Sequence, residues 1–197
     1  MLLNKIAALH FASEIHVFEP TRSCFEVLTT KFGCMDYVIL NRKAVSNRAS
    51  AVEIYYDTEK SALASLYKRN LDAFSVVMNR SEIVETNRLD MYIETMGVRH
   101  IHLLKIDIEG HEIAAFEGLG AYLHGDFIDF VQFEYGGANL DSHTSLVDLY
   151  SVFNKAGFVM AKVMRNGLEV RPYYPWMDNF QYANYVAVSH RIMAELQ

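Results

Sequence analysis

The sequence has few cysteines and prolines, and no glycine precedes Gly33. Two cysteines in 197 residues are too few for a disulfide framework or a cysteine-rich zinc site, and they are typical of buried thiols in a reducing compartment. Only three prolines occur, and there is no low-complexity tract, so no linker is evident. A glycine-rich loop that binds phosphate or a nucleotide is excluded from residues 1–32.

Long apolar runs and an excess of positive charge are also missing. No stretch approaches the ~18 apolar residues of a membrane span, and the start lacks the basic n-region of a signal peptide. Acidic residues outnumber basic ones by 24 to 18, and the resulting net charge of −6 argues against a nucleic-acid partner. We therefore expect a cytoplasmic protein with no membrane span and no bound nucleic acid.

What is present indicates a globular domain, since 51% of the residues are hydrophobic and 21% are charged. The length is compatible with a single domain over residues 1–197. Strands are predicted at 15–18, 37–40, 52–56, 82–86, 101–108, 127–134, 158–164, 168–170 and 182–188, and helices at 2–11, 22–32, 90–97, 111–123 and 144–155. This alternation predicts an α/β fold with a mainly parallel sheet, helices on both faces and an antiparallel pair at the C-terminal end. The strand at 101–108 is expected to be buried on both faces up to Ile106.

Acidic residues follow three of the predicted strands. Glu19 ends the first, Asp107 and Glu109 follow the strand at 101–108, and Glu134 ends the next one along the chain. Ligands of open α/β sheets bind beyond the carboxyl ends of the strands. Any one acid can close a strand simply because strand ends reach solvent, but acids on successive strand ends favour a shared pocket.

Other polar residues near these strands have ordinary explanations. Glu112 is interpreted as a first-turn charge of the helix that follows, where it is favourable against the helix dipole. His111 is interpreted as a residue at the helix start rather than a metal ligand. His100 and His102 are expected to face one side of the strand entrance, and the histidines show no metal-ligand spacing.

Several segments match one known family, in that family's order. They are "IHVFEP" at 15–20, "NRKAVSN" at 41–47, "ETNRLD" at 85–90, "LLKIDIEGHE" at 103–112, "FVQFEYGGAN" at 130–139, "AGF" at 156–158 and "YANYVAV" at 182–188. With these motifs the chain resembles the FkbM family of S-adenosylmethionine-dependent methyltransferases. The resemblance implies a class I methyltransferase, Rossmann-like fold and methyl transfer to a hydroxyl of a sugar, glycan or natural product. It also implies a first strand and a glycine-rich loop before residue 2, and the chain shows no counterpart of either.

The resemblance further implies roles for particular residues. Glu19 corresponds to the acid that binds the ribose of the cofactor, and Lys43 and Ala44 correspond to the turn that lies against adenine. Asp107 corresponds to the acid beside the reacting centre, where it contacts both cofactor and acceptor. The remaining candidates are expected to line the acceptor side: Glu109, His111 and Glu134.

An alcohol acceptor is a weak nucleophile at neutral pH, so a nearby base assists its reaction. Asp107 is the first choice for this base and Glu134 the second, with Glu109 completing the catalytic group. Clustered carboxylates are also able to hold Mg²⁺, but the sequence defines no ligand set, and we expect no metal.

Two other interpretations stay open. One is a different nucleotide-dependent α/β enzyme, such as a dinucleotide oxidoreductase. The absent glycine-rich loop argues against this interpretation as much as against a methyltransferase. The other is a non-catalytic Rossmann-like remnant that serves as an interaction module. Binding of S-adenosylmethionine, of a dinucleotide or of neither separates the three interpretations.

Overall fold

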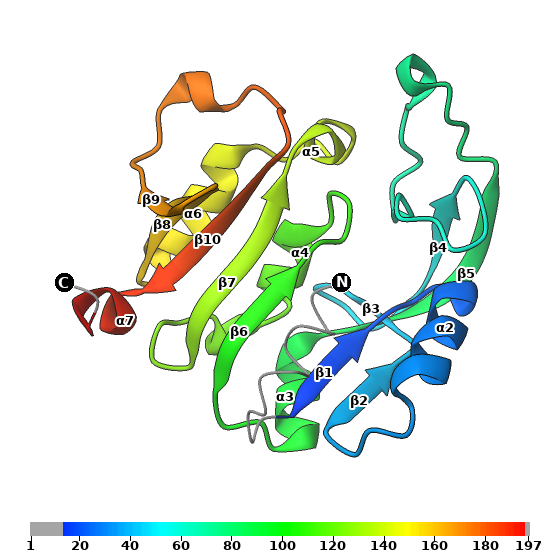
Figure 1. Ribbon diagram of the computed structural model, residues 1–197, viewed down its shortest axis with the longest axis horizontal. Helices are drawn as coiled ribbons and strands as arrows, with labels where there is room; N and C mark the ends of the chain where they lie inside the picture. Colours follow the sequence, from blue (N-terminus) through cyan, green and yellow to red (C-terminus); the bar gives the residue numbers. More distant parts are fainter. Residues whose placement is uncertain (1–13, 196–197) are drawn as a thin grey trace.

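The computed structural model describes residues 14–195 (Figure 1). The strands are β1 (Ile15–Phe18), β2 (Val38–Asn41), β3 (Ala44–Val45), β4 (Ala51–Tyr56), β5 (Arg80–Asn87), β6 (Ile101–Ile106), β7 (Ile128–Tyr135), β8 (Phe158–Met164), β9 (Gly167–Val170) and β10 (Ala183–Ser189). The helices are α2 (Arg22–Phe32), α3 (Leu89–Met96), α4 (Glu112–Glu117), α5 (Gly137–Asp141), α6 (Leu146–Lys155) and α7 (His190–Glu195), with 3-10 turns η1 (Asp72–Phe74), η2 (Gly120–Tyr122) and η3 (Pro175–Met177). The helix predicted at 2–11 lies outside the described residues. Within those residues, no helix is long and apolar enough to span a membrane.

The strands form three sheets, which together are mixed rather than mainly parallel. The largest has the order β6-β7-β10-β8-β9, a second has the order β3-β5-β4, and β1 pairs with β2. Among residues 14–195, three strand pairs are parallel and four are antiparallel. The prediction of a mainly parallel sheet is therefore wrong for the C-terminal half. The antiparallel part is larger than expected because β10 inserts between β7 and β8 and pairs with both.

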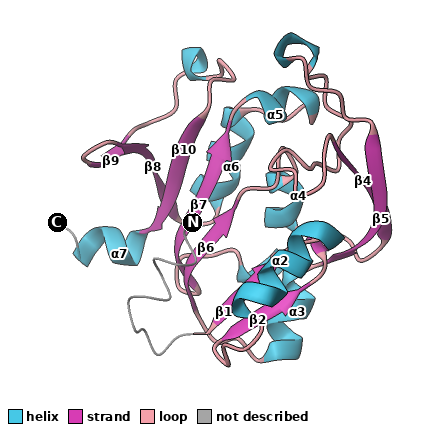
Figure 2. Cartoon of the chain, turned by 45° about the vertical axis from the view of Figure 1, so that its right-hand side comes forward, coloured by secondary structure: helices cyan, strands magenta, loops and turns pink. Residues whose placement is uncertain are grey.

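The main hydrophobic core lies between the five-stranded sheet and helices α4 and α6 (Figure 2). Side chains of β7 alternate in burial, as a strand with one covered face requires, and Phe133 is only 1% exposed. Its ring stacks on Phe153 of α6 with centroids 5.3 Å apart. The helix predicted at 111–123 ends early at Gly118, where a Cβ atom would lie 2.2 Å from the carbonyl oxygen of Ser46.

The strand β6 is more exposed than its apolar sequence predicts. Leu103 is 44% exposed, and only Ile106 among the residues of β6 is buried. Among residues 14–195, β6 pairs only with β7 and β1 pairs only with β2. The prediction that β6 is buried on both faces is therefore wrong in the described part of the chain.

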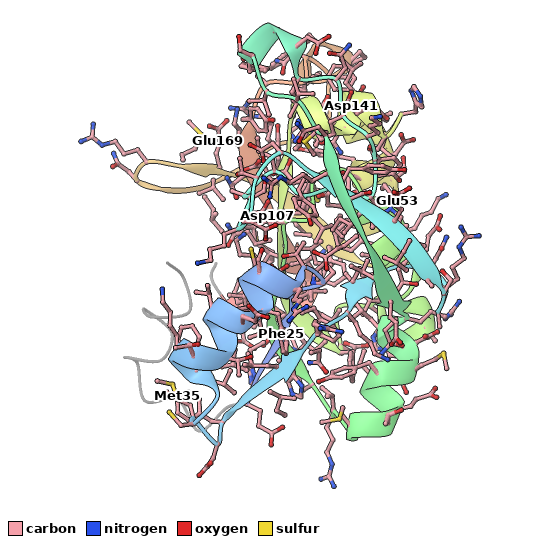
Figure 3. The ribbon with its side chains drawn as sticks, turned by 90° about the vertical axis from the view of Figure 1, so that its right-hand side faces the viewer. Phe25, Met35, Glu53, Asp107, Asp141 and Glu169 are labelled. Atoms are coloured by element: carbon pink, nitrogen blue, oxygen red, sulfur yellow. The ribbon has the colours of Figure 1, made fainter. Side chains whose placement is uncertain are left out.

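The two-stranded sheet β1-β2 has a helix on each face, α2 on one and α3 on the other (Figure 3). Tyr92 of α3 fixes this arrangement, because its hydroxyl lies 2.7 Å from Nδ1 of His16 and accepts a hydrogen bond from Asn41 at 3.1 Å. The ring of Phe18 packs edge-on against Tyr92. These contacts hold the carboxyl end of β1, and so position Glu19, which follows it.

Candidate active site

The turn after β6 is shaped by two successive residues in left-handed conformations. Glu109 has a φ of 53° and Gly110 a φ of 101°. A Cβ atom at position 110 would lie 2.7 Å from the carbonyl oxygen of Ala138, so only glycine fits there without strain. The turn lifts the side chains of Asp107 and Glu109 beyond the end of the strand.

Glu112 stabilises this turn from beneath. Its Oε1 accepts hydrogen bonds from the backbone N–H groups of Ile108 and Gly110, each at 3.2 Å. The side chain is 2% exposed, and burial raises its pKa. Glu112 does lie in the first turn of α4, as interpreted from the sequence, but its carboxyl has a further role as a buried hydrogen-bond acceptor that stabilises the turn at 108–110.

Three acidic side chains meet at the ends of β6 and β7. Asp107, Glu109 and Glu134 each place a carboxylate oxygen within 4.8 Å of the others. The two strands are parallel neighbours, with Ile106 paired with Phe133, so their carboxyl ends coincide. Asp107 and Glu109 share the turn after β6, and the structure brings to them Glu134, which lies at least 25 positions later in the sequence.

Two of these three carboxylates already have a basic partner. Lys105 donates from Nζ to Oδ2 of Asp107 at 2.6 Å, and the guanidinium of Arg69 is paired with Glu109. Arg69 also contacts Asp141 at 3.2 Å, and it donates to the hydroxyl of Tyr182 at 3.1 Å. Asp107 and Glu109 therefore each have a cationic partner on a neighbouring segment of the chain.

Burial makes the acids of this region less acidic. The pKa of Glu109 rises to about 7, because loss of solvent outweighs the opposing effect of Arg69. Burial, and then the nearby charge of Asp107, raise the pKa of Glu134. Burial also raises the pKa of Glu19, although hydrogen bonds from Thr21 act in the opposite direction. Glu109 is thus poised to gain or lose a proton near neutral pH.

A cavity of about 190 Å³ lies beside the acidic cluster. Its wall includes six of the seven residues assigned to the site from the sequence, all except Glu134: Glu19, Lys43, Ala44, Asp107, Glu109 and His111. Apolar side chains complete the wall, among them Val45 and Ile54. Figure 3 labels Asp107, which lies where the β1-β2 unit approaches the end of β6. Residues from separate parts of the sequence therefore share one hollow.

Glu19 is held so that half of its carboxylate is engaged. Oε1 accepts hydrogen bonds from the backbone N–H and the hydroxyl of Thr21, at 2.8 and 2.6 Å. Among the described residues, none donates a hydrogen bond to Oε2. Lys43, on the same wall, pairs with Glu85 at 3.3 Å. Glu19 thus has one oxygen available to a ligand in the cavity.

The segment between β4 and β5 contributes residues that the sequence interpretation missed. Ser65, Tyr67 and Arg69 occupy alternate positions of this connection, and all three contact the turn at 109–111. Ser65 donates to the carbonyl oxygen of Glu109 at 2.7 Å, and the Tyr67 hydroxyl lies 3.1 Å from Nδ1 of His111. The polar and mixed composition of residues 58–80 predicts a loop with a short helix, and the structure has a loop that contains the 3-10 turn η1. The alternation in "SLYKR" is the only local signal, and it does not reveal a partner 40 positions away.

His111 has both ring nitrogens engaged. Nδ1 faces the Tyr67 hydroxyl, and Nε2 lies 2.9 Å from Oγ of Ser46. Burial lowers the pKa of His111, which favours the neutral ring. His111 is part of the cavity wall, and its expected place on the acceptor side stays a prediction.

Comparison with known protein families identifies the family of this chain. The family model described as the methyltransferase FkbM domain matches residues 6–160, which span β1 to the start of β8. No curated protein and no solved structure matches the chain. Since the family match covers well over half of the sequence, the chain belongs to the FkbM methyltransferase family.

Proposed function

We propose that this chain is an S-adenosylmethionine-dependent O-methyltransferase whose acceptor is a hydroxyl of a sugar, a glycan or a natural product. Family membership supports methyl transfer. The observation that carries the rest is that Glu19, after β1, lines the same cavity as Asp107 and Glu109, after β6. Ligands of open α/β sheets bind beyond the carboxyl ends of the strands, and Glu19 and Asp107 each follow the carboxyl end of a strand.

In this proposal, Glu19 and the turn at Lys43 and Ala44 hold the adenosine part of the cofactor. The second oxygen of Glu19 accepts hydrogen bonds from ribose hydroxyls, since its first is occupied by Thr21. Ala44 is 8% exposed, and its small side chain leaves room for a flat ring against the apolar wall formed with Ile54.

We expect residues 1–197 to bind the cofactor only weakly. The cavity of about 190 Å³ is smaller than the ~300–1,000 Å³ of ordinary ligand pockets. In addition, no glycine precedes Gly33, so the sequence before it supplies no glycine-rich loop to contact the rest of the cofactor.

The acidic cluster is proposed to prepare the acceptor. S-adenosylmethionine supplies a methyl group already activated by a positively charged sulfur, so the protein mainly has to align the acceptor oxygen and remove its proton. Asp107 is the proposed base because it lines the cavity and is 41% exposed at the side chain, which leaves it accessible. Glu134 and Glu109 lie beside it, and a proton taken by Asp107 has near neighbours to receive it.

The experiment is a comparison of ligands on the folded chain. Calorimetry with S-adenosylmethionine, S-adenosylhomocysteine and NAD should show weak binding of the first two and none of the third. A labelled methyl group should then pass from the cofactor to one member of a panel of sugars and polyols. Binding of NAD instead would identify another nucleotide enzyme. A folded chain that binds neither cofactor would favour an interaction module and contradict the proposal.

A further inference from the structure

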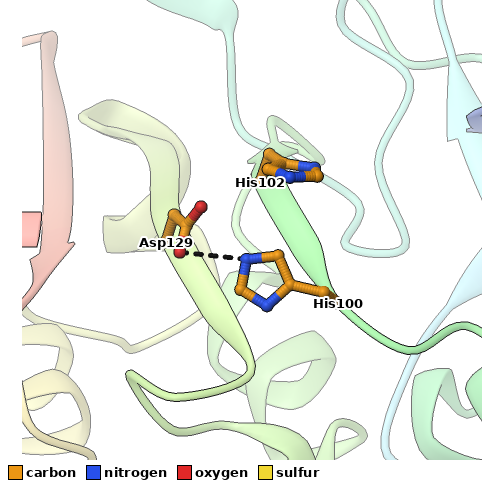
Figure 4. A group of neighbouring side chains, drawn as sticks. All are labelled: His100, His102 and Asp129. Atoms are coloured by element: carbon orange, nitrogen blue, oxygen red, sulfur yellow. Dashed lines mark ion pairs between the residues drawn. The ribbon is translucent and has the colours of Figure 1, made fainter. Parts of the chain in front are cut away.

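A second cluster of ligand-type side chains lies at the opposite ends of β6 and β7. His100 immediately precedes β6, His102 lies within it, and Asp129 lies within β7 (Figure 4). Alternate residues of a strand project from the same face, so the two histidines lie on one side. The register pairs Ile101 with Ile128 and Leu103 with Phe130, which places His102 beside Asp129 on the neighbouring strand.

The three side chains are close enough to share one ion. One ligand atom from each lies within 4.8 Å of the other two, and Nε2 of His100 lies 3.0 Å from Oδ1 of Asp129. The two imidazole rings meet edge to face with centroids 4.9 Å apart. Asp129 is 6% exposed, while His102 is exposed. The cluster thus has an anchored carboxylate and imidazoles that an ion can reach from solvent.

We propose that His100, His102 and Asp129 bind a divalent transition-metal ion, with Zn²⁺ the best match. Two imidazoles and one carboxylate are a set that Zn²⁺ accepts, and a water molecule completes a tetrahedral site. At bond lengths of ~2.1 Å, tetrahedral ligand atoms stand ~3.4 Å apart. The His100–Asp129 separation of 3.0 Å is close to this spacing, and the exposed ring of His102, whose ligand atom lies within 4.8 Å of the others, has only a short distance to move.

Arg191 of α7 forms an ion pair with the carboxylate of Asp129. Its guanidinium contacts Oδ1 of Asp129, and its other end pairs with Glu195 at 3.1 Å. The Arg191 side chain is 45% exposed, so it is able to leave Asp129 without opening the core. Among residues 14–195, none hydrogen-bonds Oδ2 of Asp129. Arg191 and the metal ion therefore compete for one charge, and removal of Arg191 should tighten metal binding.

The proposed metal site is independent of the candidate methyltransferase site. The two lie at opposite ends of β6, about 20 Å apart at the ~3.3 Å rise of a strand. An ion bound by His100, His102 and Asp129 would link β6 to β7 at their N-terminal ends and would weaken the ion pair between Arg191 and Asp129. The ion would therefore change the free energy of unfolding and the position of α7. The proposed metal site does not depend on the proposed methyltransferase activity.

The test uses chain 1–197 purified without a histidine tag and stripped of metal. Titration with Zn²⁺ by calorimetry at pH 7.5, and with Co²⁺ by its visible tetrahedral absorption, should show one bound ion. His102→Ala, a surface change, should weaken binding at least tenfold, as should Asp129→Asn. Arg191→Ala should tighten it several-fold.

Glu134→Gln is the matched control, because it alters the other cluster of three ligand-type residues and leaves this one intact. It should leave Zn²⁺ affinity unchanged. The proposal is overturned if wild type binds no Zn²⁺ at 100-fold excess, if His102→Ala binds as wild type does, or if Glu134→Gln removes binding. Unchanged affinity in Arg191→Ala would also overturn it, since the ion would then not use Asp129.

Discussion

Arg69 places its guanidinium against the carboxylate of Glu109, 40 positions later in the sequence; the Arg69 side chain is buried, at 2% exposed, and that of Glu109 is partly buried, at 14%. The pair joins the long connection between β4 and β5 to the turn that carries the acidic cluster. Because Arg69 also contacts Asp141 and Tyr182, it links this turn to α5 and to the residue that precedes β10.

Loss of Arg69 should destabilise the fold strongly. Arg69→Met removes the only basic partner that Glu109 has among the described residues, and breaking a buried ion pair typically costs ~3–5 kcal/mol in the free energy of unfolding. Urea denaturation measures the loss. Arg80→Met is the control, because the ion pair of Arg80 with Glu59 is about half exposed and should contribute less than ~1 kcal/mol. Equal effects of the two changes would contradict a structural role for Arg69.

Stability should depend on pH through Glu109. The folded protein holds a proton on Glu109 up to a pKa of about 7, whereas the unfolded chain releases it near the ordinary value of 4.5. Between these values the folded state binds more protons, so the free energy of unfolding should fall as the pH rises through this window, by up to ~3 kcal/mol.

Glu109→Gln should flatten this dependence, since glutamine does not titrate. Denaturation of wild type and variant at a series of pH values from 4.5 to 8 gives the difference, which removes the contributions of other acids. Glu59→Gln, at an exposed position, should leave the wild-type slope unchanged. Identical slopes in wild type and Glu109→Gln would show that Glu109 titrates normally.

Glu19 should contribute to cofactor affinity. Glu19→Gln keeps one oxygen for Thr21 but removes the charge from the cavity, so binding of S-adenosylmethionine should weaken by roughly 1.5–3 kcal/mol, as for a hydrogen bond to a charged group. Competition calorimetry with S-adenosylhomocysteine suits the weak binding expected. Glu26→Gln, an exposed change on α2, should bind as wild type does. Unchanged affinity in Glu19→Gln would remove the ribose assignment.

Asp107 should act in the chemical step. Asp107→Asn keeps the shape of the side chain but removes the base, so turnover on the identified acceptor should fall by ~10²-fold or more. Turnover within a few-fold of wild type, together with its loss in Glu134→Gln, would transfer the role of base to Glu134. A rate that rises with pH and levels off above about 7 would point to Glu109 instead.

The local elements of this protein follow from its sequence. The strand at 15–18, the helix at 22–32 that ends before Gly33, and the hairpin around Gly167 lie where apolar spacing and turn residues predict them. The acids at strand ends were also visible, because parallel neighbours bring their carboxyl ends together whatever the rest of the sheet does. The local elements depend on residues close together in the sequence, and the meeting of the acids depends only on the pairing of β6 with β7.

Only the tertiary structure decided the contacts that cross long distances. Nothing in the chain near Arg69 identifies Glu109 as its partner. His100 and His102 likewise show no ligand spacing in the sequence, and only the pairing of β6 with β7 places Asp129 beside His102. The insertion of β10 between β7 and β8 was likewise unpredictable, since its apolar pattern fits any covered strand position. Local propensity acts over a few residues, whereas the partner of a buried charge or a sheet strand is selected by packing of the whole chain.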